Sequence, residues 1–140
     1  MTEPMRPRLV PELNVGDLER SLDFYCGLIG FRVLYDRPEE RFSFLGLDGA
    51  ELMLGEVEQP YPAYATGLEP PEYCRVMNLQ IQVPDIDAVH ARVVGAGLPL
   101  LVPMNIRHYK THVGPITLRL FVVADPDGFV VRLQQEVARS

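Results

Sequence analysis

The stretch that decides the fold is "NLQIQVPDI", residues 78–86, because a second stretch of the same design, "VPELNVGDL", occupies residues 10–18. In both stretches apolar and polar side chains alternate, which is the period of a β-strand with one buried face. Each alternating run is followed by an aspartate, Asp17 or Asp85, that is well suited to cap the start of a helix. The chain therefore begins the same strand-to-helix unit twice.

A helix is predicted after each aspartate. Apolar residues recur there at helical spacing: Leu18, Leu22, Tyr25 and Ile29 in the first segment, and Ile86, Val89, Val93 and Ala96 in the second. Gly30 and Gly97 are expected to end the two helices, because glycine adopts the left-handed conformation that is common at helix ends.

Three strand-like segments follow each helix. They cover residues 31–36, 41–47 and 50–57 in the first half, and 99–105, 115–125 and 129–137 in the second. The strands before the two helices are expected at 8–15 and 75–83. The turn and strand "DGAELML" from Asp48 matches "DGFVVRL" from Asp127. These agreements predict a duplicated β-α-β-β-β unit.

The duplication predicts one domain over residues 1–140, with modules at about 8–57 and 74–136. Residues 58–72 contain four prolines and are expected to be a linker between the modules. Residues 103–116, which include "NIRHYK", are expected to be a loop. Either segment could border a binding groove, although loops are more often plain connections.

Composition narrows the class of partner. The formal net charge of −6 disfavours a nucleic acid, which requires clustered Lys and Arg. No apolar run reaches the length of a membrane span, and no signal peptide is recognisable, so no membrane partner is expected. Cys26 and Cys74 are interpreted as free thiols in a reducing compartment, which favours a cytoplasmic protein.

Three stretches carry a family resemblance: "NVGDLERSLDFYCGLIGFRVLYD" from Asn14, "VPDIDAVHARVVGAGLPL" from Val83, and "FVVADPDGFVVRLQ" from Phe121. With them the chain resembles the vicinal oxygen chelate superfamily, which includes glyoxalase I, extradiol dioxygenases, fosfomycin-resistance enzymes and bleomycin-resistance proteins. The resemblance implies an α+β fold in which tandem βαβββ modules form curved mixed sheets. Whether each half-barrel forms within one chain or between two stays open.

The resemblance also implies where a divalent metal would be held. Enzymes of this superfamily use His and Glu at four matched places, which align here with Val10, Met53, Asn78 and Arg132. Valine has no donor atom, methionine is a soft ligand and arginine is cationic, so these residues do not suit a hard divalent ion. We therefore expect no metal and no other cofactor.

A shifted metal site, or acid–base catalysis without metal, is the alternative at Glu12 and His112, the latter expected on the seventh strand. The other histidines fit neither role. His90 is expected on an exposed helix face, and His108 in the 103–116 loop.

A cavity on the concave side of the sheets would be lined by a mixture of amides, charges of both signs and aromatic rings. The candidate ligand-binding residues are Glu12, Asn14, Phe42, Asn78, Gln80, Arg119, Phe121 and Arg132. For the alternating amides of "NLQIQV", plain solvent exposure is the competing interpretation. The mixture favours a large, flat, polar organic ligand rather than a small phosphorylated one.

The absence of metal ligands and the opening "VPELNV" from Val10 point, within the superfamily, to bleomycin-resistance proteins. That resemblance implies a homodimer that sequesters a glycopeptide antibiotic in grooves between subunits, without covalent chemistry. Two alternatives stay open. One is a divalent-metal enzyme, such as a lyase, isomerase or dioxygenase, with a non-standard site, and the other is a regulatory module with an empty groove.

Overall fold

The computed structural model describes residues 8–57 and 77–138, and its elements follow the duplicated order. The first half contains β1 (Glu12–Val15), α1 (Leu18–Leu22), the π-helix η1 (Asp23–Ile29), β2 (Arg32–Arg37), the short 3-10 helix η2 (Pro38–Glu40), β3 (Phe42–Leu47) and β4 (Ala50–Glu56). The second half contains β5 (Asn78–Gln82), α2 (Ile86–Gly95), β6 (Leu100–Thr111), β7 (Gly114–Ala124) and β8 (Val130–Ala138). The expected linker, 58–72, lies outside the described residues.

Each half forms a mixed four-stranded sheet, in the order β1-β4-β3-β2 and β5-β8-β7-β6. The first strand of each half runs parallel to the last, and the registers correspond. Glu12 lies opposite Met53 in the first sheet, and Gln80 lies opposite Arg132 at the matching place in the second. The predicted α+β fold of two βαβββ units is therefore confirmed.

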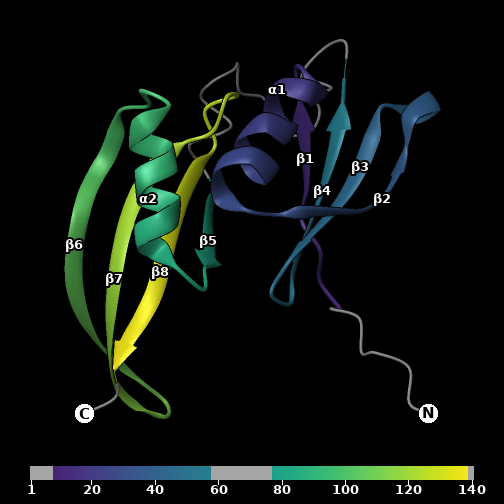
Figure 1. Ribbon diagram of the computed structural model, residues 1–140. Coiled ribbons are helices and arrows are strands. Elements are labelled where there is room, and N and C mark those ends of the chain that lie inside the picture. The colour runs from purple at the N-terminus through teal and green to yellow at the C-terminus, as the bar shows by residue number, and fades with distance from the viewer. Residues whose placement is uncertain (1–7, 58–76, 139–140) are drawn as a thin grey trace.

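One hydrophobic core is shared by both halves. In Figure 1, α2 lies in front of the second sheet and α1 lies beside it, close to β1. The apolar residues of "NLQIQV" point to the helices, because Ile81 and Val83 belong to the same buried cluster as Val89 and Val93. Leu13 and the other helix-side residues of the first sheet join this cluster. Each sheet therefore has one helix-covered face, and we call the opposite one its open face.

The first helix begins and ends where the sequence predicts, but half of it is wider than an α-helix. The Asp17 side chain accepts a hydrogen bond from the Arg20 amide at one end, and Gly30 ends the helix with φ of 112°. The intervening η1 is a π-helix, whose wider turn lets both Phe24 and Tyr25 be buried. Among the described residues, no helix has the length and apolar character needed to cross a membrane.

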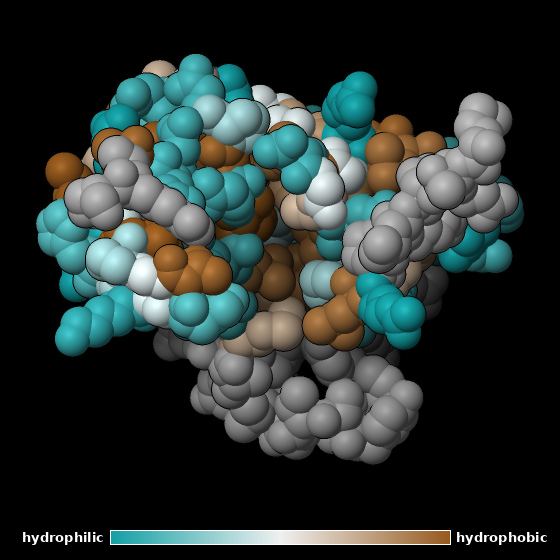
Figure 2. All heavy atoms as spheres, turned by 90° about the horizontal axis from the view of Figure 1, so that it is seen from below, coloured by the Kyte–Doolittle hydropathy of each residue, from teal (hydrophilic) through white to brown (hydrophobic). Residues whose placement is uncertain are grey.

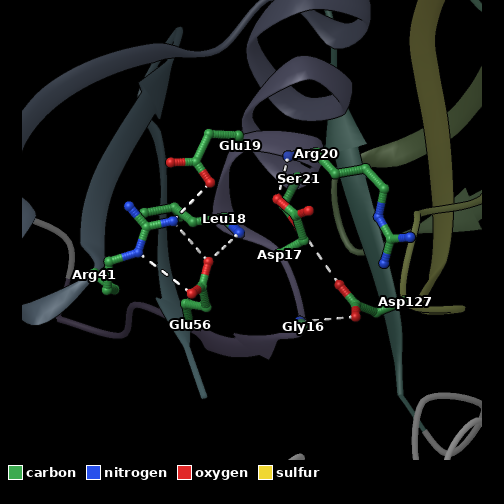
Figure 3. A network of polar contacts seen from close by, with 9 residues as sticks. All are labelled: Gly16, Asp17, Leu18, Glu19, Arg20, Ser21, Arg41, Glu56 and Asp127. Atoms are coloured by element: carbon green, nitrogen blue, oxygen red, sulfur yellow. Dashed lines mark hydrogen bonds and ion pairs between the residues drawn. The ribbon is translucent and has the colours of Figure 1, made fainter. Parts of the chain in front are cut away.

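Polar contacts join the turn before β8 to the first helix, far away in sequence (Figure 3). The Asp127 carboxylate accepts from the Gly16 amide at 3.0 Å and from the Ser21 hydroxyl at 3.4 Å. Beside it, the buried Tyr25 hydroxyl donates to Asp125 at 2.6 Å. The turn of the second half is thus fastened to the helix of the first.

The prediction of a loop over 103–116 is wrong. Most of that segment belongs to a long hairpin, because β6 runs to Thr111 and β7 starts at Gly114. His108 therefore lies on a strand, with its Nδ1 3.0 Å from the Thr117 hydroxyl. His112, expected on the seventh strand, lies instead in the turn of this hairpin.

Candidate functional site

The open face of the first sheet carries an aromatic surface. Strand pairing sets Phe44 between Met53 and Tyr35, and Phe42 between Gly55 and Arg37. The Tyr35 and Phe44 rings stack with centroids 4.8 Å apart and 16° between their planes. Phe42 and Phe44 are buried, whereas the Tyr35 side chain is 41% exposed and accessible to a ligand.

A guanidinium group lies over this surface. The Arg37 Cζ is 4.1 Å from the Phe42 ring centroid and 5.9 Å from that of Tyr35. Glu40 holds it by an ion pair. Cation–π attraction at that distance stabilises the guanidinium over the Phe42 ring, so this aromatic surface already contacts one flat cation of the chain itself.

An uncompensated carboxylate lies at the β1 edge of the same face. Glu12 is exposed, and within residues 8–57 and 77–138 its carboxylate has neither a hydrogen bond nor an ion pair. It leans towards Gly55, where an added Cβ would come within 3.2 Å of the Glu12 Oε1. The first open face therefore combines stacking surface with a free anion.

The open face of the second sheet carries paired amides. The polar residues Gln80 and Gln82 of "NLQIQV" contact other side chains there. Gln80 accepts from the Arg132 guanidinium at 3.1 Å, and Gln82 accepts from the Gln134 amide at 3.3 Å. Gln134 is only 7% exposed, and its Oε1 has no hydrogen-bond partner in the described structure. A buried carbonyl oxygen without a donor implies a bound water or a ligand N–H or O–H.

Two of the candidate ligand-binding residues do not lie on an open face. Phe121 is fully buried in the core, with its ring centroid 5.2 Å from that of His90. Arg119 shares this helix-side face and makes a two-pronged ion pair with Asp87 of α2, at 2.9 and 2.8 Å. The expected concave placement of Arg119 and Phe121 is therefore wrong. His90 is half-buried, not exposed as expected.

Strand alternation places the other six candidates, Glu12, Asn14, Phe42, Asn78, Gln80 and Arg132, on the open faces. Asn14 neighbours Gly55 in the first sheet, and Asn78 lies exposed at the start of β5. The sequence analysis missed Tyr35 and Arg37, because an irregularity between Val33 and Tyr35 shifts the register of β2 by one residue. Simple alternation along this strand gives no signal of that shift.

The residues present do not fit a divalent metal at the four family positions. Arg132 brings a guanidinium that is hydrogen-bonded to Gln80, and the other three positions hold Val10, Met53 and Asn78. Glu12 lies in the first sheet and His112 in the hairpin turn of the second half, and no group of three metal-ligating side chains in the described chain contains either of them.

The three carboxylates that do gather, Asp17, Glu19 and Glu56, already have partners (Figure 3). Arg41 pairs with Glu19 at 2.6 Å and with Glu56 at 2.8 Å. The hydrogen bonds from Arg41 lower the pKa of both glutamates. Glu56 also accepts from the Leu18 amide at 2.8 Å, so this group anchors the first helix rather than a cation.

Comparison with known families agrees with this architecture. The model of the family described as "Glyoxalase/Bleomycin resistance protein/Dioxygenase superfamily" matches residues 8–133. The chain belongs to this superfamily. Its members are thus related to this chain over both βαβββ units, including the strands that carry the two open faces.

Similar proteins include an enzyme and several solved structures. Catechol-2,3-dioxygenase of Bacillus subtilis (strain 168) is 29% identical over 129 residues, which are 92% of this chain but 41% of that protein. TioX from Micromonospora sp. ML1 has a TM-score of 0.69 at 23% identity, covering 94% and 99% of the two chains. A protein from the mobile metagenome of V. Pseudocholerae has a TM-score of 0.67 at 16% identity, covering 99% and 100%. These structural likenesses show the fold alone.

Proposed function

We propose that this protein is a metal-free small-molecule-binding protein of the bleomycin-resistance type. It sequesters a large, flat, polar organic molecule, such as a glycopeptide antibiotic, in a groove of a homodimer. The observation that carries the proposal is the stacked Tyr35–Phe44 pair on an open face, with the unpaired Glu12 carboxylate two strands away. Stacking surface beside a free anion suits a planar ligand that bears a positive charge.

The second sheet supplies the complementary polar part of the groove. The side chains of Gln80, Gln82 and Arg132 offer amide and guanidinium hydrogen bonds, and Gln134 has an oxygen that needs a donor. A ligand with many amide and hydroxyl groups satisfies such a surface better than an apolar one. A twofold dimer would place two equivalent grooves between the subunits.

A divalent-metal enzyme is the second candidate, and the identity to catechol-2,3-dioxygenase favours it. The donor set argues against it, because Met53 and Arg132 occupy positions where the superfamily's enzymes have metal ligands. Metal analysis of the purified protein separates the two candidates. Stoichiometric Mn, Fe, Ni or Zn that survives dialysis would support the enzyme and contradict the proposal.

The test of the proposed function is a calorimetric titration of metal-analysed protein with metal-free and copper-loaded bleomycin. We expect submicromolar binding at one drug per chain, on the scale of specific complexes. Tyr35→Ala is expected to weaken binding by about 3–10-fold through lost stacking, and Glu12→Gln by about tenfold through lost charge pairing.

Asp23→Asn is the matched control, because Asp23 is an exposed carboxylate on η1, on the helix side of the molecule. It should leave the affinity unchanged. If neither form of the drug produces heat, bleomycin is excluded as the ligand. If the drug binds equally well to all three variants, the assignment of the groove to the open faces is wrong.

A further inference from the structure

A small pocket lies at the seam between the two halves, on the helix side of the strands. Figure 2 shows a hollow with apolar residues between the two halves of the molecule, seen from below. The pocket measures about 250 Å³, and its apolar wall is formed by Pro11, Phe31, Ala50, Leu52, Leu79 and Ile81. It is therefore lined by both sheets, yet mainly by the face opposite to the proposed groove.

The internal repeat explains why the pocket is there. In the match of "DGAELML" with "DGFVVRL", Ala50 occupies the position that Phe129 has in the second half. Phe129 is 2% exposed and belongs to the shared core. The pocket in the first half thus lies where the matching unit has a benzyl side chain, and alanine leaves that space unfilled.

The size and polarity of the pocket indicate what fits. An apolar cavity of about 150 Å³ holds benzene, so the 250 Å³ seam pocket accommodates one six-membered ring with a substituent. Glu51 and Gln80 add polar atoms to the lining. Strand alternation turns both of these side chains to the open faces, Glu51 with Met53 and Gln80 with Arg132, so the helix-side wall that meets a ligand is apolar.

We propose that the seam pocket binds a single aromatic ring with one small substituent. The ring takes the place that a phenylalanine side chain has in the other half. The ligand contacts both halves and so stabilises their packing. This site is independent of the proposed groove, although Gln80 borders both.

The test uses phenol as the probe and cyclohexanol as a non-aromatic compound of similar size. Two-dimensional amide NMR of the full chain follows both titrations. Phenol is expected to shift the amides of Ala50 and Leu79 with a Kd on the order of 1 mM or tighter, and cyclohexanol to bind at least threefold more weakly. Absence of shifts at the seam, or equal binding of the two compounds, would overturn the proposal.

Ala50→Phe supplies the missing ring from within the chain. We expect this variant to bind phenol at least tenfold more weakly and to unfold at a higher temperature than the wild type. Ala50→Leu fills less of the pocket and serves if the larger side chain prevents folding. Ala91→Phe, at an exposed position on α2, is the control and should bind phenol normally. A folded Ala50→Phe protein with wild-type affinity would refute the site.

Because bleomycin binding should be normal in Ala50→Phe, failure of the seam site and failure of the proposed groove give different results.

Discussion

The two βαβββ units share their hydrogen-bonded framework and differ in the side chains that fill it. Glu56 accepts from the Leu18 amide at the start of α1, and Gln135, at the matching position, accepts from the Ile86 amide at the start of α2. The same helix start is therefore stabilised twice, once by a carboxylate and once by an amide. The two units thus share the hydrogen bond to the first amide of the helix but differ in the charge of the side chain that accepts it.

The seams between the units differ more strongly. At one seam, the turn of the second unit is anchored by Asp125 and Asp127, and Phe129 fills the core. At the other, the Asp48–Gly49 turn makes no side-chain hydrogen bond to the second unit in the described structure, and the pocket beside Ala50 lies open. One seam is filled by a buried aromatic side chain, whereas the other leaves a pocket.

The largest expected effect on stability comes from removing the Phe129 ring, which makes the filled seam resemble the seam that has the pocket. Phe129→Ala should lower the free energy of unfolding by about 3–5 kcal/mol, because it removes a buried ring and leaves a cavity. Urea denaturation followed by circular dichroism measures this loss. Phe31→Leu keeps most of the buried volume at the other seam and should cost far less. A Phe129→Ala loss below about 1 kcal/mol would mean that the ring contributes little to the packing of the two units.

A smaller effect is expected from Tyr25→Phe, which removes the buried hydrogen bond to Asp125. Loss of a hydrogen bond to a charged group should cost about 1–3 kcal/mol at neutral pH. Burial raises the pKa of Asp125, and the Tyr25 hydroxyl opposes this rise by stabilising the carboxylate. The deficit of Tyr25→Phe should therefore be complete above the Asp125 pKa and shrink as the pH falls through it.

Unfolding curves of the wild type and Tyr25→Phe between pH 3 and 8 test whether the stability deficit of the variant shrinks as the pH falls. The control is Asp125→Asn, which cannot titrate at this position. Because a raised pKa makes the ionised Asp125 costly to bury, the wild type should lose stability relative to Asp125→Asn as the pH rises through that range. A deficit of Tyr25→Phe that does not change with pH would show that the hydroxyl does not interact with the ionised carboxylate.

Much of the fold was predictable because its signals are local. Alternation in "NLQIQV", the caps at Asp17 and Asp85, and glycine at Gly30 each express a backbone requirement that neighbouring residues reveal. The hairpin over 103–116 was not predicted, since residues 106–114 resemble a loop, and it is the pairing of β6 with β7 that extends both strands through them. Tertiary pairing, rather than propensity, decides that segment.

The candidate site was predictable only in part. The face of the sheet on which a side chain lies depends on irregularities in strand pairing, and the identity of a single residue does not reveal these. Gln80 and Arg132 were expected on one face and hydrogen-bond there. Arg119 was expected beside them, but it reaches Asp87, a residue 32 positions away on the helix side. Tyr35 was missed because of the irregularity in β2. Regular alternation therefore located the amides on the open face of the second sheet but not Tyr35 and Arg37 on that of the first.

The smallest expected effect comes from Glu56→Gln, which gives the first helix start the uncharged side chain that Gln135 provides in the second. Arg41, and then the Leu18 amide, lower the pKa of Glu56 in the folded state. A lowered carboxylate pKa adds stability above the unfolded pKa, and this contribution is lost as the pH falls through the folded value. Glu56→Gln should thus be slightly less stable at neutral pH, with a flatter acid dependence than the wild type.

High salt separates the two parts of the Glu56 contribution. Because Arg41 is exposed and Glu56 is partly exposed, 1 M NaCl should screen their attraction and reduce the wild-type advantage, while the hydrogen bond to the Leu18 amide persists. Glu39→Gln is the control, since Glu39 is exposed on η2 and should leave the acid dependence unchanged. If Glu56→Gln retains the full acid dependence of the wild type, the helix start responds to hydrogen bonding alone, and the two units are equivalent at this position.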